Sequence, residues 1–428
     1  MRSRNTASEG TQKVAVIGQG YVGLPLAMRA VEVGHDVVGY DTNASRIDSL
    51  GDGCSYIGDV LNDQLARALA SGRYRPSYDP VDCRGFDVAI ITVPTPLKEG
   101  IPDLSDVESA GRMVASQLSR GSCVVLESTT YPGTTRELLG PVLESGSGLR
   151  AGIDFHLGYS PERIDPGNST WTLENTPKVV SGLTKACLDR IEAFYLTIVE
   201  RTVAVSTPAE AELTKLLENT FRHVNIALVN EVAMFANELG INIWEALDAA
   251  TTKPFGFMRF DPGPGVGGHC LPVDPSYLSW HFRQQGGSQF RFVELANDVN
   301  NHMPRYVVDR VGMILNRERK AVNGSRILVL GLAYKRNSGD ARESPGPVIC
   351  GLLSDLGAEV RAADPFLSDQ DFPDAAKRVD ATPEELAAAE LVVVVTDHDD
   401  FDWEAVARSS NVFDTRRRLP ASANVEYL

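Results

Sequence analysis

One cysteine in this chain of 428 residues lies in a setting that could support covalent catalysis. Cys270 falls within segment 262–272, which contains four glycines and three prolines, a composition that predicts an ordered loop rather than a helix or strand. Glycine lets backbone N–H groups approach a ligand, and a thiol beside them can trap a carbonyl and stabilise the charge that develops. A carboxylate, Asp274, follows four residues later. The alternative interpretation is a tight structural turn around a buried cysteine.

The amino-terminal residues predict a site for a dinucleotide. Residues 13–17 have the composition of a buried parallel strand, and a G-x-G-x-x-G sequence at 18–23 opens a predicted helix that ends near Val33. A second predicted strand, 36–40, leads to Asp41, about 20 residues after the glycines. The glycines would place a pyrophosphate at the helix N-terminus. Asp41 would bind the ribose 2′-hydroxyl and repel a 2′-phosphate, so the pattern predicts NAD rather than NADP.

Three further strands are predicted at 86–93, 123–127 and 156–160, each followed by polar residues. Ligands of doubly wound sheets bind just beyond the carboxyl ends of the strands. Hydroxyl-rich ends at the first two strands fit a cofactor crevice, although hydroxyl groups also cap local structure. Glu162 follows the third strand, and taken alone it fits a solvated surface acid better than a catalytic one.

The middle of the chain changes to a helical pattern from about residue 208 to residue 239, long enough to join two domains or to form a dimer surface. Lys215 and Asn219 are four residues apart and project from one face of this helix. An exposed lysine with a neighbouring asparagine is the more ordinary interpretation of that pair. A second α/β unit begins near Arg326, with strands at 327–330, 359–363 and 391–395 and a helix at 346–356.

These patterns predict an α/β fold with two Rossmann-like doubly wound domains joined by a long central helical region. The expected divisions are a disordered N-terminus at 1–12, an NAD-binding Rossmann domain at 13–206, a central helical and dimerisation region with the Cys270 loop at 207–302, a connection at 303–324, and a second nucleotide-holding Rossmann-like domain at 325–428.

Composition excludes several classes of protein. A net charge of −16 argues against a nucleic-acid coat and against binding to an anionic membrane surface. The six cysteines form no C-x-x-C pair, the first residues lack the apolar core of a signal peptide, and no run approaches the ~20 apolar residues of a membrane span. We expect a cytoplasmic protein with reduced thiols. His269 and Cys270 lack a partner motif, so no metal site is predicted.

The chain resembles the nucleotide-sugar 6-dehydrogenases, which include the UDP-glucose, UDP-N-acetylglucosamine and UDP-N-acetylmannosamine enzymes. Six motifs carry the resemblance: GQGYVGLPLA at 18–27, STTYPGT at 128–134, SPER at 160–163, KLLENTFRHVNIALVNE at 215–231, PGPGVGGHCLPVDP at 262–275 and GLAYKRNSGDARESP at 331–345. The similarity extends over roughly residues 14–413. It implies that the carboxy-terminal domain binds a nucleoside-diphosphate sugar and that the chain forms a homodimer or higher homo-oligomer.

The resemblance also implies a reaction. Two NAD+ would oxidise the sugar C6 from alcohol through aldehyde to carboxylate, by way of a thiohemiacetal and a thioester on a cysteine. The implied catalytic residues are Cys270 as nucleophile, Lys215 and Asn219 as oxyanion partners, Asp274 as proton relay, and Thr129 and Glu162 as groups that position water, with Glu162 as the base for hydrolysis.

The implied binding residues fall into two sets. For the cofactor they are Gly18, Gly20, Tyr21, Val22, Gly23, Asp41, Arg46, Thr95, Thr129 and Arg342. For the substrate they are Glu162, Arg163, Lys215, Asn219, Phe260, Gly263, Gly267, Gly268 and Lys335.

Several alternatives stay open. Segment 253–275 is most similar to the bacterial N-acetylhexosamine branch, but Arg259 and Asp261 replace an expected proline and aromatic residue, which leaves the hexose undecided. The same reaction on a dTDP-hexose is one alternative. A two-electron β-hydroxyacid-type dehydrogenase is another, although it needs no thiol, and Cys270 with Asp274 argues against it. A sensor that has lost catalysis is the third, and the presence of every expected catalytic residue argues against it.

Overall fold

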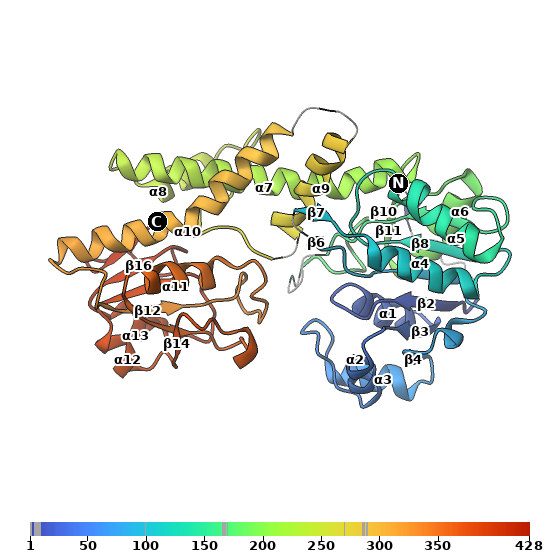
Figure 1. The fold of residues 1–428 in the computed structure, drawn as a ribbon, viewed down its shortest axis with the longest axis horizontal. Coiled ribbons are helices and arrows are strands. Elements are labelled where there is room, and N and C mark those ends of the chain that lie inside the picture. Colours follow the sequence, from blue (N-terminus) through green and yellow to red (C-terminus); the bar gives the residue numbers. More distant parts are fainter. Residues whose placement is uncertain are drawn as a thin grey trace. The chain divides into compact units, whose positions relative to one another are not determined.

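The structure is a computed structural model that describes residues 2–3, 10–98, 100–164, 168, 170–268, 270–284, 287 and 290–428, with 2–3, 270–273 and 284 described in their backbone only. The chain divides into two compact units, Met1–Glu218 and Asn219–Leu428 (Figure 1). Among the described residues, no helix combines the length and the apolar character that a membrane crossing requires.

The first unit is built on a parallel sheet of six strands. The order is β4 (Tyr74–Ser77), β3 (Asp36–Tyr40), β2 (Lys13–Ile17), β5 (Val88–Ile91), β8 (Cys123–Leu126) and β9 (His156–Tyr159). Every neighbouring pair is parallel. The order reverses direction between β2 and β5, which is where a doubly wound sheet opens a crevice for a ligand.

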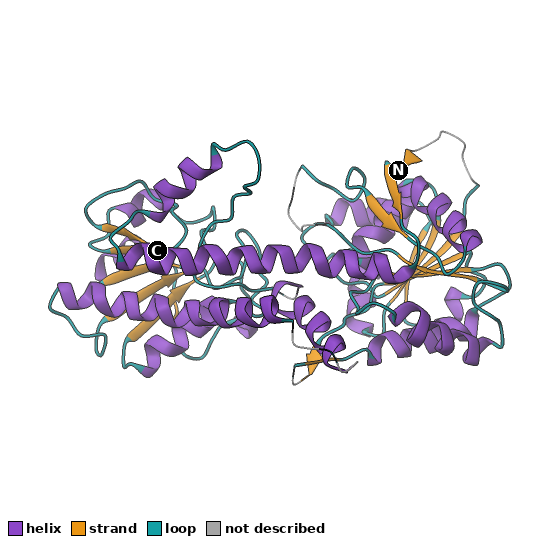
Figure 2. Cartoon of the chain, turned by 90° about the horizontal axis from the view of Figure 1, so that it is seen from above, coloured by secondary structure: helices purple, strands orange, loops and turns teal. Residues whose placement is uncertain are grey.

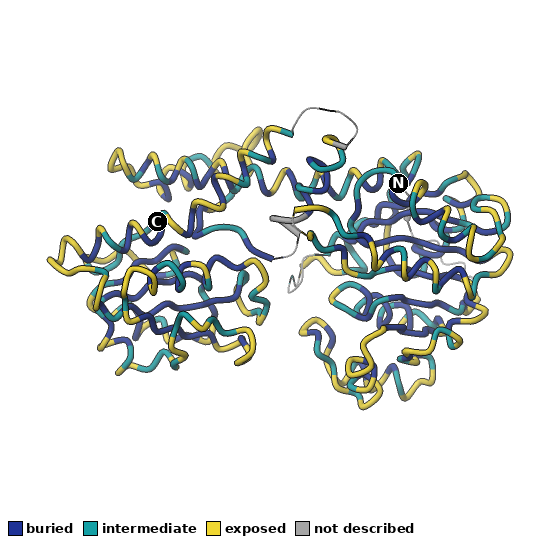
Figure 3. The backbone as a smooth tube through the Cα atoms, viewed as in Figure 1, coloured by how far each residue is buried: buried dark blue, intermediate teal, exposed yellow. Residues whose placement is uncertain are grey.

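Helices cover this sheet. They are α1 (Gly23–Glu32), α2 (Ala44–Gly51), α3 (Asn62–Ala70), α4 (Ser105–Gln117), α5 (Gly140–Ser147) and α6 (Lys185–Ile198), with short turns at η1 (Pro80–Cys83) and η2 (Thr135–Leu139). Residues of α1, α3 and α6 form one core with Val14 and Val16 of β2. Figure 3 shows the strands of each unit as the buried interior. Two small sheets complete the unit: a hairpin of β6 (Leu97–Lys98) and β7 (Ile101–Pro102), and β1 (Arg2–Ser3), β11 (Arg201–Ala204) and β10 (Lys178–Val180).

The second unit contains another parallel sheet of six strands. The order is β14 (Lys377–Arg378), β13 (Glu359–Ala363), β12 (Arg326–Leu330), β15 (Leu391–Val394), β16 (Val412–Asp414) and β17 (Val425–Tyr427). Successive residues of a strand face opposite sides. Ile327 and Val329 therefore pack with α10 (Arg291–Arg317) and α11 (Pro345–Asp355), while Leu328 and Leu330 pack with α12 (Pro383–Ala388) and α13 (Trp403–Ala407).

A long helix, α7 (Pro208–Glu238), begins in the first unit and ends in the second, where α8 (Ile243–Thr251), α9 (Cys270–Gln284) and η3 (Asp369–Asp371) also lie. The part of α7 in the second unit runs beside α10, and Ala227 packs against Ala296 and Val299 (Figure 2). Small residues at this contact let the two helices approach closely.

The predicted α/β class with two Rossmann-like sheets and a central helical region is confirmed, and the strand bounds agree within two residues. Residues 303–317 of the expected connection are helical and form the second half of α10. Two expectations need correction. Segment 262–272 is not a loop throughout, because α9 begins at Cys270.

Proline explains why that helix start was missed. Pro272 lies in the first turn of α9, where N–H groups have no partner within the helix, so the missing N–H of proline costs nothing. Pro275 lies inside the helix.

At the N-terminus, Arg2–Ser3 pairs with β11 instead of being disordered, while residues 1 and 4–9 of the expected disordered segment lie outside the described residues.

Candidate active site

The turn between β2 and α1 leaves room for a ligand to approach the backbone. Gly18 has a φ of 96°, and a Cβ added at Gly23 would lie 1.8 Å from the Gly18 carbonyl oxygen. Both positions therefore require glycine. A Cβ added at Gly20 would meet no atom within 4 Å, so open space lies there, close to the positive end of α1. This combination fits the pyrophosphate of a dinucleotide.

Asp41 is fixed at the carboxyl end of β3. The carboxylate is buried and accepts hydrogen bonds from the backbone N–H groups of Gln19 (2.9 Å) and Asn43 (2.9 Å). Arg46 Nη1 lies 3.7 Å from Asp41 Oδ2, and the Arg46 guanidinium lies 5.7 Å from the centre of the Tyr56 ring. A carboxylate held beside the glycine turn suits recognition of ribose hydroxyls.

Hydroxyl groups gather where β5 and β8 end. Thr92 Oγ1 donates to the Gly18 carbonyl (2.9 Å), which ties the end of β5 to the glycine turn. Thr130 is fully buried, and its hydroxyl has no hydrogen-bonding partner in the part of the chain that the structure describes. The Thr130 side chain therefore belongs to the interior at this edge of the sheet.

Glu162, after β9, is held by several donors. Glu162 Oε1 accepts the backbone N–H groups of Arg163 and Ile164, each at 2.6 Å, and Oε2 lies 3.3 Å from Lys178 Nζ. Burial acts to raise the pKa of Glu162, but Lys178 and the N–H of Ile164 outweigh it, so the pKa lies below its usual value. Lys215 Nζ donates to the Glu162 carbonyl oxygen at 2.6 Å. The structure thus brings two predicted site residues, Glu162 and Lys215, together in the first unit.

Lys178 bridges two buried carboxylates. Its Nζ lies 2.9 Å from Glu127 Oε2 as well as 3.3 Å from Glu162, and Tyr195 donates its hydroxyl to the other oxygen of Glu127. Burial raises the pKa of Glu127 more than Lys178 lowers it. A hollow of about 10 Å³ beside Glu162 and Lys178 approaches the volume that one water molecule needs.

In the second unit, Asp274 of α9 is buried and accepts a hydrogen bond of 2.5 Å from Asn219 Nδ2 of α7. Asp274 is one helical turn after Cys270, the first residue of α9. The side chain of Cys270 is outside the described atoms. A residue at the start of a helix lies at the positive end of the helix dipole, which lowers the pKa of a thiol.

The glycines before Cys270 make close contacts with protein. A Cβ at Gly267 would lie 2.6 Å from Cβ of Tyr334, and a Cβ at Gly268 would lie 2.9 Å from the Tyr334 ring. The N–H of Gly268 donates to the Arg342 carbonyl (2.9 Å), and the N–H of Gly263 donates to Asn230 Oδ1 (2.9 Å). These glycines are therefore needed for packing against the 331–345 motif, and these two N–H groups are already paired.

The carboxy-terminal motif has its own supporting contacts. Asp364, at the end of β13, accepts the N–H groups of Leu332 (2.7 Å) and Ala333 (2.9 Å) and contacts His398 Nε2 at 3.0 Å. His398 Nδ1 accepts the N–H of Asn337 at 3.0 Å. The segment that carries Lys335 is thereby fixed at both ends. The Arg342 side chain pairs with Asp340 (2.6 Å).

Arg259 and Asp261, the two departures from the expected pattern, belong to one ion-pair network. Arg259 contacts Asp261 (2.8 Å) and Asp248 (2.7 Å), and Asp248 also contacts Arg417 (2.7 Å). The network anchors the segment before the glycine loop to α8 and to the turn that follows β16. Both unusual residues thus have a structural partner.

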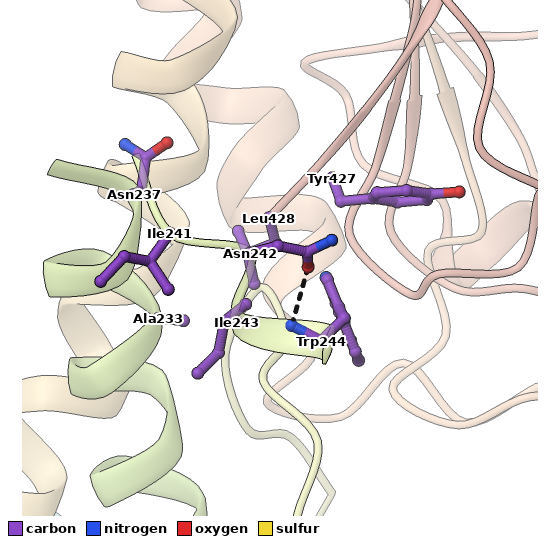
Figure 4. A pocket seen from close by; sticks show the side chains of 8 residues that line it. All are labelled: Ala233, Asn237, Ile241, Asn242, Ile243, Trp244, Tyr427 and Leu428. Carbon is purple, nitrogen blue, oxygen red and sulfur yellow. Dashed lines mark hydrogen bonds between the residues drawn. The ribbon is translucent and has the colours of Figure 1, made fainter. Parts of the chain in front are cut away.

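A larger pocket of about 130 Å³ lies where α7 meets α8 (Figure 4). Its lining is Ala233, Asn237, Ile241, Asn242, Ile243, Trp244, Tyr427 and Leu428. None of the predicted site residues is among them, so size alone does not mark the active site.

Comparison with known proteins decides the family. Residues 12–199, 209–302 and 328–421 match, respectively, the NAD binding, central and UDP binding domains of the UDP-glucose/GDP-mannose dehydrogenase family. The chain belongs to this family. It is an NAD-dependent nucleotide-sugar dehydrogenase, and NAD is its cofactor, as the sequence predicted.

The relatives agree along most of their length. A UDP-N-acetyl-D-mannosamine dehydrogenase of Pyrococcus horikoshii is 35% identical over 401 residues, 93% of each chain. A UDP-N-acetyl-D-glucosamine 6-dehydrogenase of Pseudomonas aeruginosa is 39% identical over 363 residues, 84% of each chain. The solved structure of the UDP-D-ManNAc dehydrogenase from Pyrococcus horikoshii superposes with a TM-score of 0.88 at 34% identity, covering 97% of this chain and 98% of that one.

Several supporting residues of this dehydrogenase were missed by sequence reasoning. They are Glu127, Lys178 and Tyr195 around Glu162, Glu212 at the start of α7, and His223, Asn230 and Asn300 beneath the glycine loop. Glu127 lies directly before the STTYPGT motif, and His223 and Asn230 lie inside the α7 motif, so proximity to motifs was the available signal. Lys178, Tyr195 and Asn300 carried no such signal.

Proposed function

We propose that this dehydrogenase oxidises the C6 hydroxymethyl group of a UDP-N-acetylhexosamine to a carboxylate in two successive two-electron steps. The observation that carries the proposal is the placement of Cys270 as first residue of α9, one turn before Asp274, whose carboxylate accepts a hydrogen bond from Asn219. The relatives named above, which act on UDP-N-acetylhexosamines, support the choice of sugar.

In this mechanism the alcohol is first oxidised to an aldehyde. The Cys270 thiolate adds to the aldehyde carbon, a C–S bond forms, and the oxygen takes a proton to give a thiohemiacetal. A second oxidation converts this to a thioester, and water then breaks the C–S bond to release the carboxylate and the thiol. NAD+ accepts one hydride in each oxidation, so one sugar, two NAD+ and one water give one carboxylate, two NADH and three protons.

The surrounding residues have separate tasks in the proposal. Lys215 and Asn219 stabilise the negative charge on the reacting oxygen. Asp274 relays the proton between that oxygen and solvent. Glu162 accepts a proton from the water that cleaves the thioester, and Thr129 orients that water. Support for a base at Glu162 comes from its ionised state and from the water-sized hollow beside it.

The residues named above for binding the cofactor and the substrate are part of this proposal. The fixed segment around Lys335 suits contact with the diphosphate or sugar, whereas the pairing of Arg342 with Asp340 would have to open for Arg342 to reach a ligand. The open space beside Gly20 and the fixed carboxylate of Asp41 support the proposed cofactor-binding residues.

The test is a panel of UDP-N-acetylmannosamine, UDP-N-acetylglucosamine, UDP-glucose and dTDP-glucose, each assayed for NADH released per sugar consumed. We expect two NADH per sugar and the highest kcat/KM with one of the N-acetylhexosamines. One NADH with free aldehyde as the final product would replace the proposal with a two-electron dehydrogenase. The highest kcat/KM with dTDP-glucose would overturn the assignment of the nucleotide.

The proposal includes a homodimer formed through α7. Large apolar side chains stand exposed at helical spacing along this helix: Leu213, Leu217, Phe221, Leu228, Val232 and Phe235. An apolar stripe of this length on a solvent-facing helix is typical of an interface between subunits.

The cytoplasmic location expected from the sequence stays a prediction.

A further inference from the structure

The cluster beneath Glu162 has a composition that a purely structural ion pair does not need. It contains one lysine and two carboxylates: Lys178 begins β10, Glu127 follows β8, and Glu162 follows β9. Lys178 and Glu127 side chains are 3% and 0% exposed, so neither is part of the surface. Lys178 also donates to the Pro161 carbonyl (3.2 Å), which satisfies its third N–H.

Lys178 and the two carboxylates do not balance in charge. With both acids ionised, the buried cluster carries one negative charge more than Lys178 can neutralise. After uptake of one proton, Lys178 still pairs with one ionised acid, so the cluster can accept a proton without leaving the buried lysine without a counter-ion. Because Glu127 is closed off and Glu162 borders the water-sized hollow, the proton from water would enter at Glu162.

The two partners of the cluster act on Glu162 in opposite directions. The ammonium of Lys178 favours the ionised form of Glu162. A negative charge on Glu127, which shares the same Lys178 Nζ, favours the protonated form of Glu162. Tyr195 donates to Glu127 and so holds that charge in place. Other titratable groups near the cluster are Lys215 of α7, Cys123 of β8 and Arg163, which lines the same hollow.

We propose that Lys178 and Glu127 are positioning residues that together set the basicity of Glu162: Lys178 keeps its carboxylate ionised before the hydrolysis step, and Glu127 makes it ready to accept one proton. When Glu162 takes the proton from the attacking water, Lys178 keeps Glu127 as its counter-ion. The lysine is then never left as an isolated buried charge. This inference rests on the proposed function, in which Glu162 is the base of hydrolysis.

The test is the pH dependence of kcat for the wild type and the variants K178M and E127Q, measured with the preferred nucleotide sugar. Without the lysine, burial raises the pKa of Glu162, so K178M should move the acid limb of kcat upward by at least about one pH unit. Without the second acid, Lys178 pairs with Glu162 alone and lowers the pKa of Glu162. E127Q should therefore lower the plateau of kcat and move the acid limb downward. KM should change little in either variant.

The matched control is K185M, since Lys185 is an exposed lysine of α6 paired with Asp189, and its profile should equal that of the wild type. Thermal melts establish that each variant is folded. If K178M does not fold, the double variant E127Q/K178M, which leaves only one buried acid, should still show an upward shift, smaller than that expected for K178M, because burial alone then acts on Glu162. Acid limbs that stay in place in the folded variants, or that move in the same direction, would overturn the inference.

E162Q separates this inference from the proposed function. A wild-type rate for E162Q would remove Glu162 from the reaction, and with it the basis of the inference. An impaired E162Q together with unshifted limbs in K178M and E127Q would refute the positioning roles alone. A wild-type protein that oxidises none of the nucleotide sugars would refute the proposed function itself.

Discussion

The backbone places Cys270 at the N-terminal end of α9. It is the first residue of a helix of 15 residues, where the partial positive charge of the unpaired N–H groups is concentrated. Thiols at helix N-termini have lowered pKa values and are better nucleophiles near neutral pH. The five cysteines whose side chains are described are Cys54, Cys83, Cys123, Cys187 and Cys350, and four of them are buried. Burial raises the pKa of Cys83 to about 11 and of Cys123 to about 12, which keeps both as inert thiols.

Replacing Cys270 by serine should separate catalysis from packing. We expect C270S to fold and to bind NAD, while steady-state turnover falls by at least ~10³-fold, equivalent to roughly 4 kcal/mol of activation barrier. A serine hydroxyl is a weaker nucleophile without a dedicated base, and an ester is cleaved more slowly than a thioester. Mass spectrometry after mixing with substrate and NAD+ should detect a retained aldehyde or ester. The control is C54S at the exposed Cys54; near-wild-type turnover of C270S would leave Cys270 as a packing residue.

Asp41 should decide the choice of cofactor. The wild type should prefer NAD over NADP, because a 2′-phosphate would meet a fixed, buried carboxylate. In D41N the repulsion is removed, so the ratio of kcat/KM for NAD to that for NADP should fall at least about tenfold, or roughly 1.4 kcal/mol. D36N, at the opposite end of β3, is the matched control, since Asp36 pairs with Arg73 on the surface. Equal use of both cofactors by the wild type would place Asp41 away from the ribose.

At the scale of elements, a buried polar network joins α7, α10 and the glycine loop. Asn230 Nδ2 donates to Asn300 Oδ1 (3.0 Å), while Asn230 Oδ1 accepts the N–H of Gly263 (2.9 Å). His223 belongs to the same network, and its Nε2 lies 2.8 Å from Asn297 Oδ1. Buried networks of this kind fix a single geometry when every member is satisfied. Two long helices thus hold the start of the loop that leads to Cys270.

Removing Asn230 should disturb that loop. N230A leaves the N–H of Gly263 and the amide oxygen of Asn300 without the partners that Asn230 provides, which costs about 1–3 kcal/mol of unfolding free energy. Turnover should fall more than stability alone explains, because the loop before Cys270 loses a fixed point. N225A on the same helix is the control, since within the described part of the chain the Asn225 amide donates to the Phe221 carbonyl of its own helix. Urea unfolding and kcat for both variants test this, and equal effects would show that the network only stabilises the fold.

Glu212 ties the start of α7 to the turn after β8. Its carboxylate accepts the N–H groups of Gly133 (2.6 Å) and Thr135 (2.8 Å) and the Thr135 hydroxyl (2.6 Å). Burial raises the pKa of Glu212 to about 7, although the bonds from Thr135 and Gly133 oppose the shift. The folded state therefore holds this proton more tightly than the unfolded state does.

The sign of the resulting pH dependence follows from linkage. The stability that Glu212 contributes is complete below the unfolded pKa of 4.5 and is lost as pH rises through about 7. Since E212Q does not titrate, the wild-type unfolding free energy minus that of E212Q should fall by on the order of 2–3 kcal/mol between pH 4.5 and pH 8. Urea unfolding at several pH values measures this difference. A constant difference would show that Glu212 is ionised throughout.

At the scale of the whole molecule, the exposed apolar stripe of α7 predicts the oligomeric state. The wild type should sediment as a dimer or larger assembly at micromolar concentration, since Leu228 and Phe235 are 57% and 58% exposed in a single chain. The double variant L228E/F235E should shift toward monomer, because charges are costly in an apolar interface. L61E, at an exposed leucine before α3, is the control for added charge. A strictly monomeric wild type would contradict the assignment of α7 as an interface.

The sequence by itself determined the elements whose signals are local. The glycine turn with Asp41, the apolar strands of both sheets and the length of α7 depend on residues within about 30 positions, so composition and spacing were sufficient. The motifs also identified Glu162, Lys215 and Cys270 as residues of one family of dehydrogenases, and the comparisons confirmed that family.

Only the tertiary structure decided how those residues are supported. Lys178 and Glu127 are 51 residues apart, and Asn230 and Asn300 are 70 apart, so no local pattern predicts that they meet. The start of α9 at Cys270 was hidden for a different reason, because proline opposes a helix in general but is accepted in its first turn. The glycines at 267 and 268 likewise suggested a backbone that a ligand can approach, whereas the ring of Tyr334 fills the space beside them. Local sequence records which residues can do chemistry; burial and long-range pairing set the charge and the geometry with which they do it.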